Sequence, residues 1–162
     1  MIDSYHQVSV ELIRAQVQPG QTFKLRVISD SMSPMLQVAD IVVAQPIEAA
    51  DAQNGDVLVF QHGAEMITHR LINRQADRLY LKGDNRRAAD EPVEARSIVG
   101  RVIAIERSGR SIDLRQPRWA RINRSVGELS GLQARIMNAS HLAGRLSAGP
   151  IRILIRSLFS FV

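Results

Sequence analysis

Residues 54–72 read Asn-Gly-Asp-Val-Leu-Val-Phe-Gln-His-Gly-Ala-Glu-Met-Ile-Thr-His-Arg-Leu-Ile, two apolar runs with a turn signal between them. The runs Val57–Phe60 and Met66–Ile72 are rich in β-branched and other apolar residues, which favours strands. Asn54-Gly55-Asp56 and His62-Gly63 supply the residue types that tight connections require. This stretch therefore predicts two short strands, each preceded by a tight turn.

The same pattern extends on both sides of this stretch. Further strands are predicted at Phe23–Ile28, Ile41–Ala44, Arg78–Leu81 and Ile98–Glu106, with turns at Pro19-Gly20 and Gly83-Asp84-Asn85. No helical periodicity separates these runs, so a parallel α/β fold is not favoured. We expect a mainly β fold, a small antiparallel β barrel or sheet domain covering residues 1–114.

The periodicity changes after Pro117. Apolar residues then recur every three or four positions, which places them along one side of a helix: Trp119, Ile122, Val126, Leu129, Leu132 and Ile136. Residues 151–162 repeat this spacing, and Gly144, Gly149 and Pro150 separate the two segments. We therefore expect residues 115–162 to form a short α-helical, basic and amphipathic C-terminal extension.

Composition narrows the classes of site. The chain has 162 residues and no cysteine, which excludes disulfide scaffolds, thiol nucleophiles and cysteine-based metal centres. His6, His62 and His141 are scattered without paired carboxylates at metal-ligand spacing. Because no phosphate-cradling glycine loop is present either, we expect no cofactor and no metal.

Charge is distributed unevenly along the chain. From residue 115 onward there are eight arginines and one acid, Glu128, which gives this part a charge of +7, so residues 1–114 carry about −2 and the whole chain +5. Such a segment could contact an anionic membrane surface through residues 151–162, or pack against the body of the protein. Nucleic acid is not expected as a partner, because only seven residues of the chain are aromatic and base stacking needs more.

Hydropathy predicts where the chain resides. No stretch approaches the roughly 18 to 20 consecutive apolar residues of a transmembrane helix, and the segment from Met1 to His6 lacks the features of a signal peptide. The expected location is cytoplasmic, with peripheral membrane association through the C-terminal segment as an open alternative.

A serine-containing turn directly follows the first predicted strand and reads Ser29-Asp30-Ser31-Met32-Ser33-Pro34-Met35-Leu36. Alone, it indicates a turn. In the same order, however, the chain continues with 55–60 (Gly-Asp-Val-Leu-Val-Phe), 68–72 (Thr-His-Arg-Leu-Ile), 82–85 (Lys-Gly-Asp-Asn) with Asp90, and 98–102 (Ile-Val-Gly-Arg-Val).

Together these segments resemble the signal peptidase I family, especially its archaeal and endoplasmic-reticulum branch, which shares its fold with the SOS-repressor peptidases. The resemblance covers roughly residues 27–106. It implies that Ser31, the serine of the Ser-Met pair, is the nucleophile and that His69 is the general base. An aspartate seven residues after the glycine of Lys-Gly-Asp-Asn is the third member, which implies Asp90.

Elementary chemistry supports these roles. A serine hydroxyl needs an adjacent base to remove its proton, and histidine exchanges protons near neutrality. A carboxylate beyond the imidazole fixes its tautomer and stabilises the imidazolium. The backbone N–H of Ser31 and the hydroxyl of Ser29 are candidate donors to the oxyanion.

Two positions depart from the family pattern. Asp30 stands where glycine is usual, and a carboxylate there opposes a developing negative charge unless it points away. Ala39-Asp40 stands where the family generally has Gly-Asp. The sequence thus predicts a serine endopeptidase of signal peptidase I type acting on a peptide or protein. The alternative is a catalytically weak or inactive binding or regulatory module on the peptidase fold.

Some residues near these motifs have structural interpretations. His69 could be a core histidine. Asp40, Asp56 and Asp84 are expected to cap turns by bonding local backbone N–H groups. Lys82 is expected to belong to a turn, unsuited to act as a lysine base. Self-cleavage is not favoured, because no Ala-Gly or Cys-Gly bond precedes Ser31.

Overall fold

The computed structural model describes residues 13, 17 and 20–143, with side chains up to residue 136. Within them the chain forms an eight-stranded antiparallel sheet followed by a long helix, which confirms the mainly β prediction. The elements are β1 (Phe23–Arg26), β2 (Ile41–Gln45), the 3₁₀ turn η1 (Ala49–Asp51), β3 (Val57–His62), β4 (Glu65–Gln75), β5 (Arg78–Lys82), β6 (Val93–Glu94), the 3₁₀ turn η2 (Ala95–Ser97), β7 (Ile98–Arg107), β8 (Arg110–Asp113) and α2 (Pro117–Ala143).

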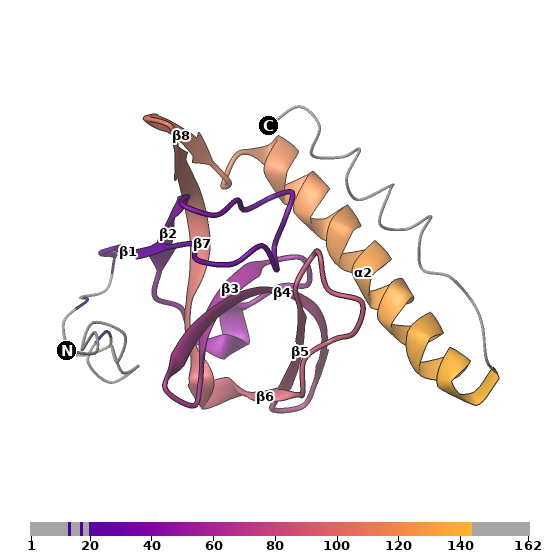
Figure 1. Cartoon of the computed structure of the whole chain (residues 1–162). Coiled ribbons are helices and arrows are strands. Elements are labelled where there is room, and N and C mark those ends of the chain that lie inside the picture. The colour runs from indigo at the N-terminus through magenta and orange to yellow at the C-terminus, as the bar shows by residue number, and fades with distance from the viewer. Residues whose placement is uncertain (1–12, 14–16, 18–19, 144–162) are drawn as a thin grey trace, which may run out of the picture.

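The long strand β7 organises the sheet, whose order is β1-β2-β7-β3-β4-β5-β6. One edge of β7 pairs with β2, while its other edge pairs first with β3 and then with β8. Figure 1 shows the strands β3 to β6 curling round at one end of β7, with β1, β2 and β8 at the other. All strand pairs within the described residues are antiparallel.

Turn chemistry explains most of the connections. Gly63 has φ +61° in the β3–β4 hairpin and Gly55 has φ +97° just before β3, as the sequence indicates. The short strands β6 and β8 were not predicted. The β7–β8 turn places Ser108 at φ +48° and Gly109 at φ +76°. Successive left-handed residues are typical of a tight hairpin turn, so the Ser-Gly pair was the signal for β8.

The apolar side chains form two cores. One lies between the β1, β2 and β7 end of the sheet and α2, and it includes Met32, Met35, Val59, Trp119 and Val126. The other lies inside the curl of β3 to β6 and includes Leu58, Phe60, Leu71, Leu79 and Leu81. Alternate residues of β3 therefore enter different cores, because successive side chains of a strand point to opposite faces.

The buried face of α2 overlaps the predicted one but is rotated from it. Trp119 and Val126 are buried, but Leu132 is 50% exposed, whereas Ser130 and Gln133 are fully buried. Their side-chain polar atoms have no hydrogen-bond partner within the described part of the chain. Close backbone contact explains the rotation. A Cβ added at Gly127 would lie 2.8 Å from the Cα of Gly55, so the small residues of α2 must face the sheet.

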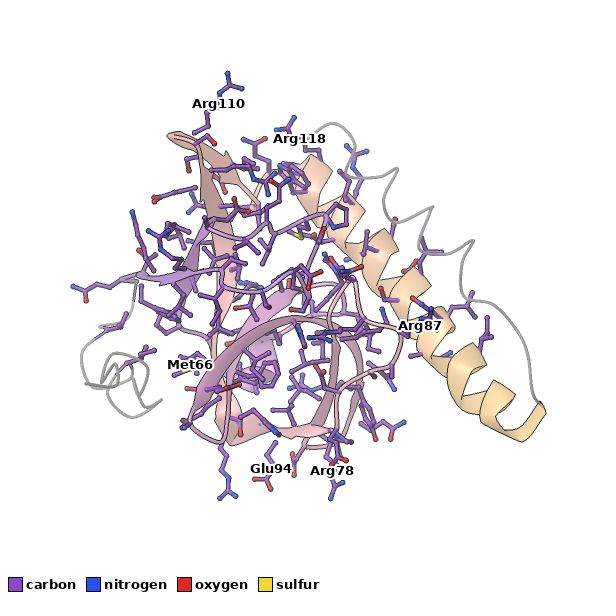
Figure 2. The ribbon with its side chains drawn as sticks, viewed as in Figure 1. Met66, Arg78, Arg87, Glu94, Arg110 and Arg118 are labelled. Atoms are coloured by element: carbon purple, nitrogen blue, oxygen red, sulfur yellow. The ribbon has the colours of Figure 1, made fainter. Side chains whose placement is uncertain are left out.

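Figure 2 shows charged side chains at both ends of the protein. Arg110 and Arg118 project beside β8 and the start of α2, while Arg78 and Glu94 project from the opposite end. Within the described residues, no helix is long and apolar enough to cross a membrane. Met1–His6 and the amphipathic segment 151–162 lie outside those residues, so the membrane contact stays a prediction. The division of the chain at residue 114 is also still a prediction.

Candidate active site

Backbone hydrogen bonds hold the serine-containing turn in place at the end of β1. The N–H of Val27 donates to the Asp40 carbonyl (2.8 Å) and the N–H of Ala39 to the Val27 carbonyl (2.9 Å), which closes residues 27–40 into a loop at the end of β1. Inside the loop, Met32 and Met35 are buried in the first core. These anchors fix the intervening backbone, so Ser31 has a defined place next to β4.

Ser31, His69 and Asp90 converge in space. The Oγ of Ser31 lies 3.1 Å from Nε2 of His69, and Nδ1 of His69 lies 2.5 Å from Oδ2 of Asp90. An ionised carboxylate only accepts hydrogen bonds, so Nδ1 donates to Asp90 and Nε2 is left to accept the serine proton. Both Ser31 and His69 are buried, at 8% and 6% exposure. His69 therefore has polar partners on both ring nitrogens, unlike a histidine that merely fills a core.

The turn after β5 brings the third residue to the imidazole. The N–H of Asp90 donates to the carbonyl of Leu81 (2.9 Å), which folds the segment back along β5. The N–H of Asn85 donates to the carbonyl of Ser31 (2.8 Å), which ties the same turn to the serine loop. A Cβ on Gly83 would lie 2.6 Å from that carbonyl oxygen and 3.0 Å from Nε2 of His69. Only glycine fits at this approach.

Ser29 and Asp30 flank the hydroxyl of Ser31. The Oγ atoms of Ser29 and Ser31 are 3.3 Å apart. Within the described residues the backbone N–H of Ser31 donates no hydrogen bond, so it is free to meet a substrate oxygen. The carboxylate of Asp30 is exposed and accepts from the side-chain amide of Asn85 at 3.2 Å. A negative charge therefore sits one residue from the hydroxyl, held by a neutral partner.

Arg70, the residue after His69, forms a hydrogen-bond network that the sequence analysis did not predict. Arg70 is fully buried, and Nε and Nη2 donate to the two carboxylate oxygens of Asp84 at 2.8 and 2.7 Å. Its other three N–H groups donate to the Gly55 carbonyl, to Oδ1 of Asn123 on α2 and to Sδ of Met35. All five donors of the guanidinium are thus used. In the sequence, the signal for this network was a charged residue, Arg70, inside an apolar run.

Two expectations about the neighbouring turn are wrong. Asp84 does not cap the turn locally, because its carboxylate accepts from Arg70 and is fully buried. Lys82 is not in a turn but ends β5, where it is fully buried and Nζ donates to the Gly83 carbonyl at 3.2 Å. The buried arginine explains the first outcome, since an ionised guanidinium inside a protein needs a carboxylate partner.

The other turn predictions are confirmed. The carboxylates of Asp40 and Asp56 accept from the backbone N–H groups of Gln37 (2.7 Å) and Gln53 (2.9 Å). Ala39 adopts φ +78°, a left-handed conformation that strains a residue with a Cβ. This backbone requirement accounts for glycine in the corresponding Gly-Asp pair of the family that the motifs resemble.

Comparison with known families agrees with this arrangement. Residues 2–103 match the family model described as Peptidase S24-like, which spans more than half of the chain. The chain belongs to the Peptidase S24-like family. Membership supports a function of the serine peptidase type, and the antiparallel sheet is consistent with the S24-like fold. No curated protein matches the chain.

Part of the structure beyond the S24-like match also contacts the candidate site. It ends at residue 103, inside β7, and so includes the serine loop, His69 and Asp90 but not β8 or α2. Yet Asn123 of α2 bonds the arginine that follows His69. The helix is therefore connected to the candidate site by a partly buried hydrogen bond.

Proposed function

We propose that this protein is a serine endopeptidase of signal peptidase I type, with Ser31 as nucleophile, His69 as general base and Asp90 as the orienting carboxylate. The single observation that carries the proposal is the line of hydrogen bonds from the Ser31 hydroxyl through the imidazole to Asp90. Both distances lie within the reach that proton transfer requires.

In the proposed reaction, Oγ of Ser31 attacks the carbonyl carbon of a peptide bond and its proton passes to Nε2 of His69. The carbonyl oxygen becomes an oxyanion that accepts from the backbone N–H of Ser31 and the hydroxyl of Ser29. His69 then gives its proton to the leaving amine, and the C–N bond breaks to leave an acyl ester. Water, deprotonated by His69, releases the acid and restores the serine hydroxyl.

The base identity supports the signal peptidase type, and specifically its histidine branch. A lysine base would require a neutral amine nitrogen within reach of the Ser31 hydroxyl. Lys24 instead pairs with Glu106 at 2.7 Å on the exposed side of β1. The Nζ of Lys82 donates to the Gly83 carbonyl. Nε2 of His69 lies 3.1 Å from the hydroxyl oxygen of Ser31, within hydrogen-bonding reach.

A serine-reactive fluorophosphonate probe tests the nucleophile directly. We expect intact-mass analysis to show one adduct on the full chain, and peptide mapping to place it on Ser31. Ser31→Ala should abolish the adduct, and His69→Ala should slow its formation by about 10²- to 10⁴-fold. Ser111→Ala and His62→Ala, which change exposed residues of β8 and β3, are the matched controls.

Peptide cleavage tests the rest of the proposal. Incubation with a peptide library, read by mass spectrometry, should yield products that the Ser31→Ala variant does not produce. An adduct that persists in Ser31→Ala would overturn the assignment of the nucleophile. A chain that neither reacts with the probe nor cleaves any peptide would instead support the alternative of a binding or regulatory module. The structural feature that favours this alternative is the negative charge of Asp30 beside Ser31.

A further inference from the structure

A pocket lies between the sheet and α2, on residues that the proposed reaction does not use. Its volume is about 270 Å³, and its walls come from the end of β2, the turn before β3, the middle of β7 and the first turns of α2. Figure 1 shows α2 running along this side of the sheet. Neither Ser31 nor His69 lines it.

The pocket presents hydrogen-bond donors that have no partner. Within the described residues, the side chains of Arg124, Asn54 and Gln45 line it without making a hydrogen bond or an ion pair. Asn123 also lines it, and its Oδ1 accepts from Arg70, so its amide nitrogen remains to donate elsewhere. These are the donors that hold phosphate and carboxylate oxygens in proteins.

Charge in the pocket favours an anion. Arg101, Arg115 and Arg124 line it together with one carboxylate, Asp56. That carboxylate is already engaged by Arg101 at 3.2 Å and by the N–H of Gln53 at 2.9 Å. Arg115 pairs with Asp113, and this hydrogen bond lowers the pKa of the Asp113 carboxyl. Arg124 is left as the uncompensated cation of the described pocket lining.

We propose that this pocket is a binding site for a small oxyanion, a phosphate or carboxylate group, held by the guanidinium of Arg124 and the amide donors around it. The volume admits such a group together with a few further atoms, and is at the small end of ligand pockets. The proposal does not depend on peptidase activity.

The pocket is also connected to His69. Two of its walls, Gly55 and Asn123, accept the two hydrogen bonds from Nη1 of Arg70. Arg70 follows His69 in β4 and holds Asp84, whose neighbour Gly83 lies so near the imidazole that a Cβ there would be 3.0 Å from Nε2 of His69. An anion that draws on Asn123 therefore acts on the group that positions the turn beside Ser31. We expect occupancy of the pocket to change the reactivity of Ser31.

Calorimetric titration of the full chain with inorganic phosphate, and in parallel with malonate, tests the site at constant ionic strength set by chloride. We expect a millimolar dissociation constant for at least one of them, and which one binds distinguishes phosphate from carboxylate. Arg124→Gln should weaken binding at least about tenfold, as expected on loss of a charge-assisted hydrogen bond. The matched control is Arg121→Gln, an exposed arginine of the same helix that does not line the pocket.

A second pair of variants separates charge from shape. Ala120 lines the pocket and is exposed, so Ala120→Glu places a carboxylate at its mouth, whereas Ala120→Gln adds the same bulk without charge. We expect the glutamate to abolish binding and the glutamine to weaken it less. No binding of either anion, or equal weakening by Arg124→Gln and Arg121→Gln, would overturn the proposal.

Probe labelling of Ser31 tests the connection. At saturating anion, the labelling rate should change at least about twofold in wild type and in Arg121→Gln, and stay unchanged in Arg124→Gln. Binding without any change in rate would leave the site standing and overturn its link to His69. A chain that binds the anion but does not react with the probe refutes the peptidase proposal alone.

Discussion

The guanidinium of Arg70 holds both carboxylate oxygens of Asp84, at 2.8 and 2.7 Å, where both side chains are fully buried. The pair joins β4, which carries His69, to the turn that contacts Ser31. Removing one partner leaves the other charge buried without compensation, which is far more costly than losing an exposed ion pair.

Arg70→Met should therefore lower the free energy of unfolding by about 3 to 5 kcal/mol. Urea unfolding measures it. Lys24→Met is the control, because the Lys24–Glu106 pair is exposed and such pairs contribute at most about 1 kcal/mol. Equal effects of the two variants would show that the buried network does not stabilise the fold.

Asp90→Asn should slow the reaction of Ser31 with the fluorophosphonate probe by about 10²- to 10⁴-fold without unfolding the protein. An amide at this place no longer stabilises the imidazolium and can favour the wrong tautomer of His69. Circular dichroism checks the fold, and Asp77→Asn, an exposed aspartate in the β4–β5 turn, is the control. Unchanged labelling would remove Asp90 from the mechanism.

Gly83→Ala should separate activity from stability. The added methyl group meets the Ser31 carbonyl and Nε2 of His69, so the serine and its base must move apart. We expect labelling to fall at least about tenfold, since displacements of this kind cost that much or more, with a loss of stability of about 1 to 3 kcal/mol. Labelling at the wild-type rate would contradict the close approach.

Ala39→Gly should stabilise the protein by about 0.5 to 1 kcal/mol. The φ of +78° strains alanine, and glycine relieves that strain at the cost of more freedom in the unfolded chain. Thermal and urea unfolding measure the change. A destabilised variant would mean that the loop needs the methyl group of Ala39 more than it needs a relaxed backbone.

Asp30→Asn should raise the rate of probe labelling about two- to fivefold at low salt. Its carboxylate repels the negative charge that develops next to Ser31, and salt screens such an exposed charge. The difference from wild type should therefore shrink in 1 M sodium chloride, while Asp51→Asn, an exposed aspartate elsewhere, has no effect. A slower Asp30→Asn variant would assign the carboxylate a supporting role instead.

Most of the strands and turns could be predicted from the local sequence. The runs around Val57–Phe60 and Met66–Ile72 each became part of a strand, because alternating apolar residues and glycine turns act over a few residues. The strand β8 was missed, since it has only four residues and its Ser108-Gly109 turn is short. Leu132 was misplaced because apolar spacing on a helix does not reveal where two glycines permit backbone contact.

The candidate site was predictable only through motif order. Ser31, His69 and Asp90 are far apart in sequence, and their meeting depends on the β4–β5 pairing and on the return of the chain to Leu81. Arg70 and Asp84 could not be paired from the sequence, because a buried ion pair leaves no spacing pattern. Asn123 lies beyond the matched residues, so its bond to Arg70 required the packing of α2.

The contact between Gly55 and Gly127 limits where this protein can be truncated. With backbone against backbone at that crossing, cutting the chain after β8 would expose the turn before β3 to water and deprive Arg70 of Asn123. A fragment ending at Asp113, after β8, should therefore be insoluble or protease-sensitive on expression, and should recover when residues 117–143 are supplied as a separate peptide.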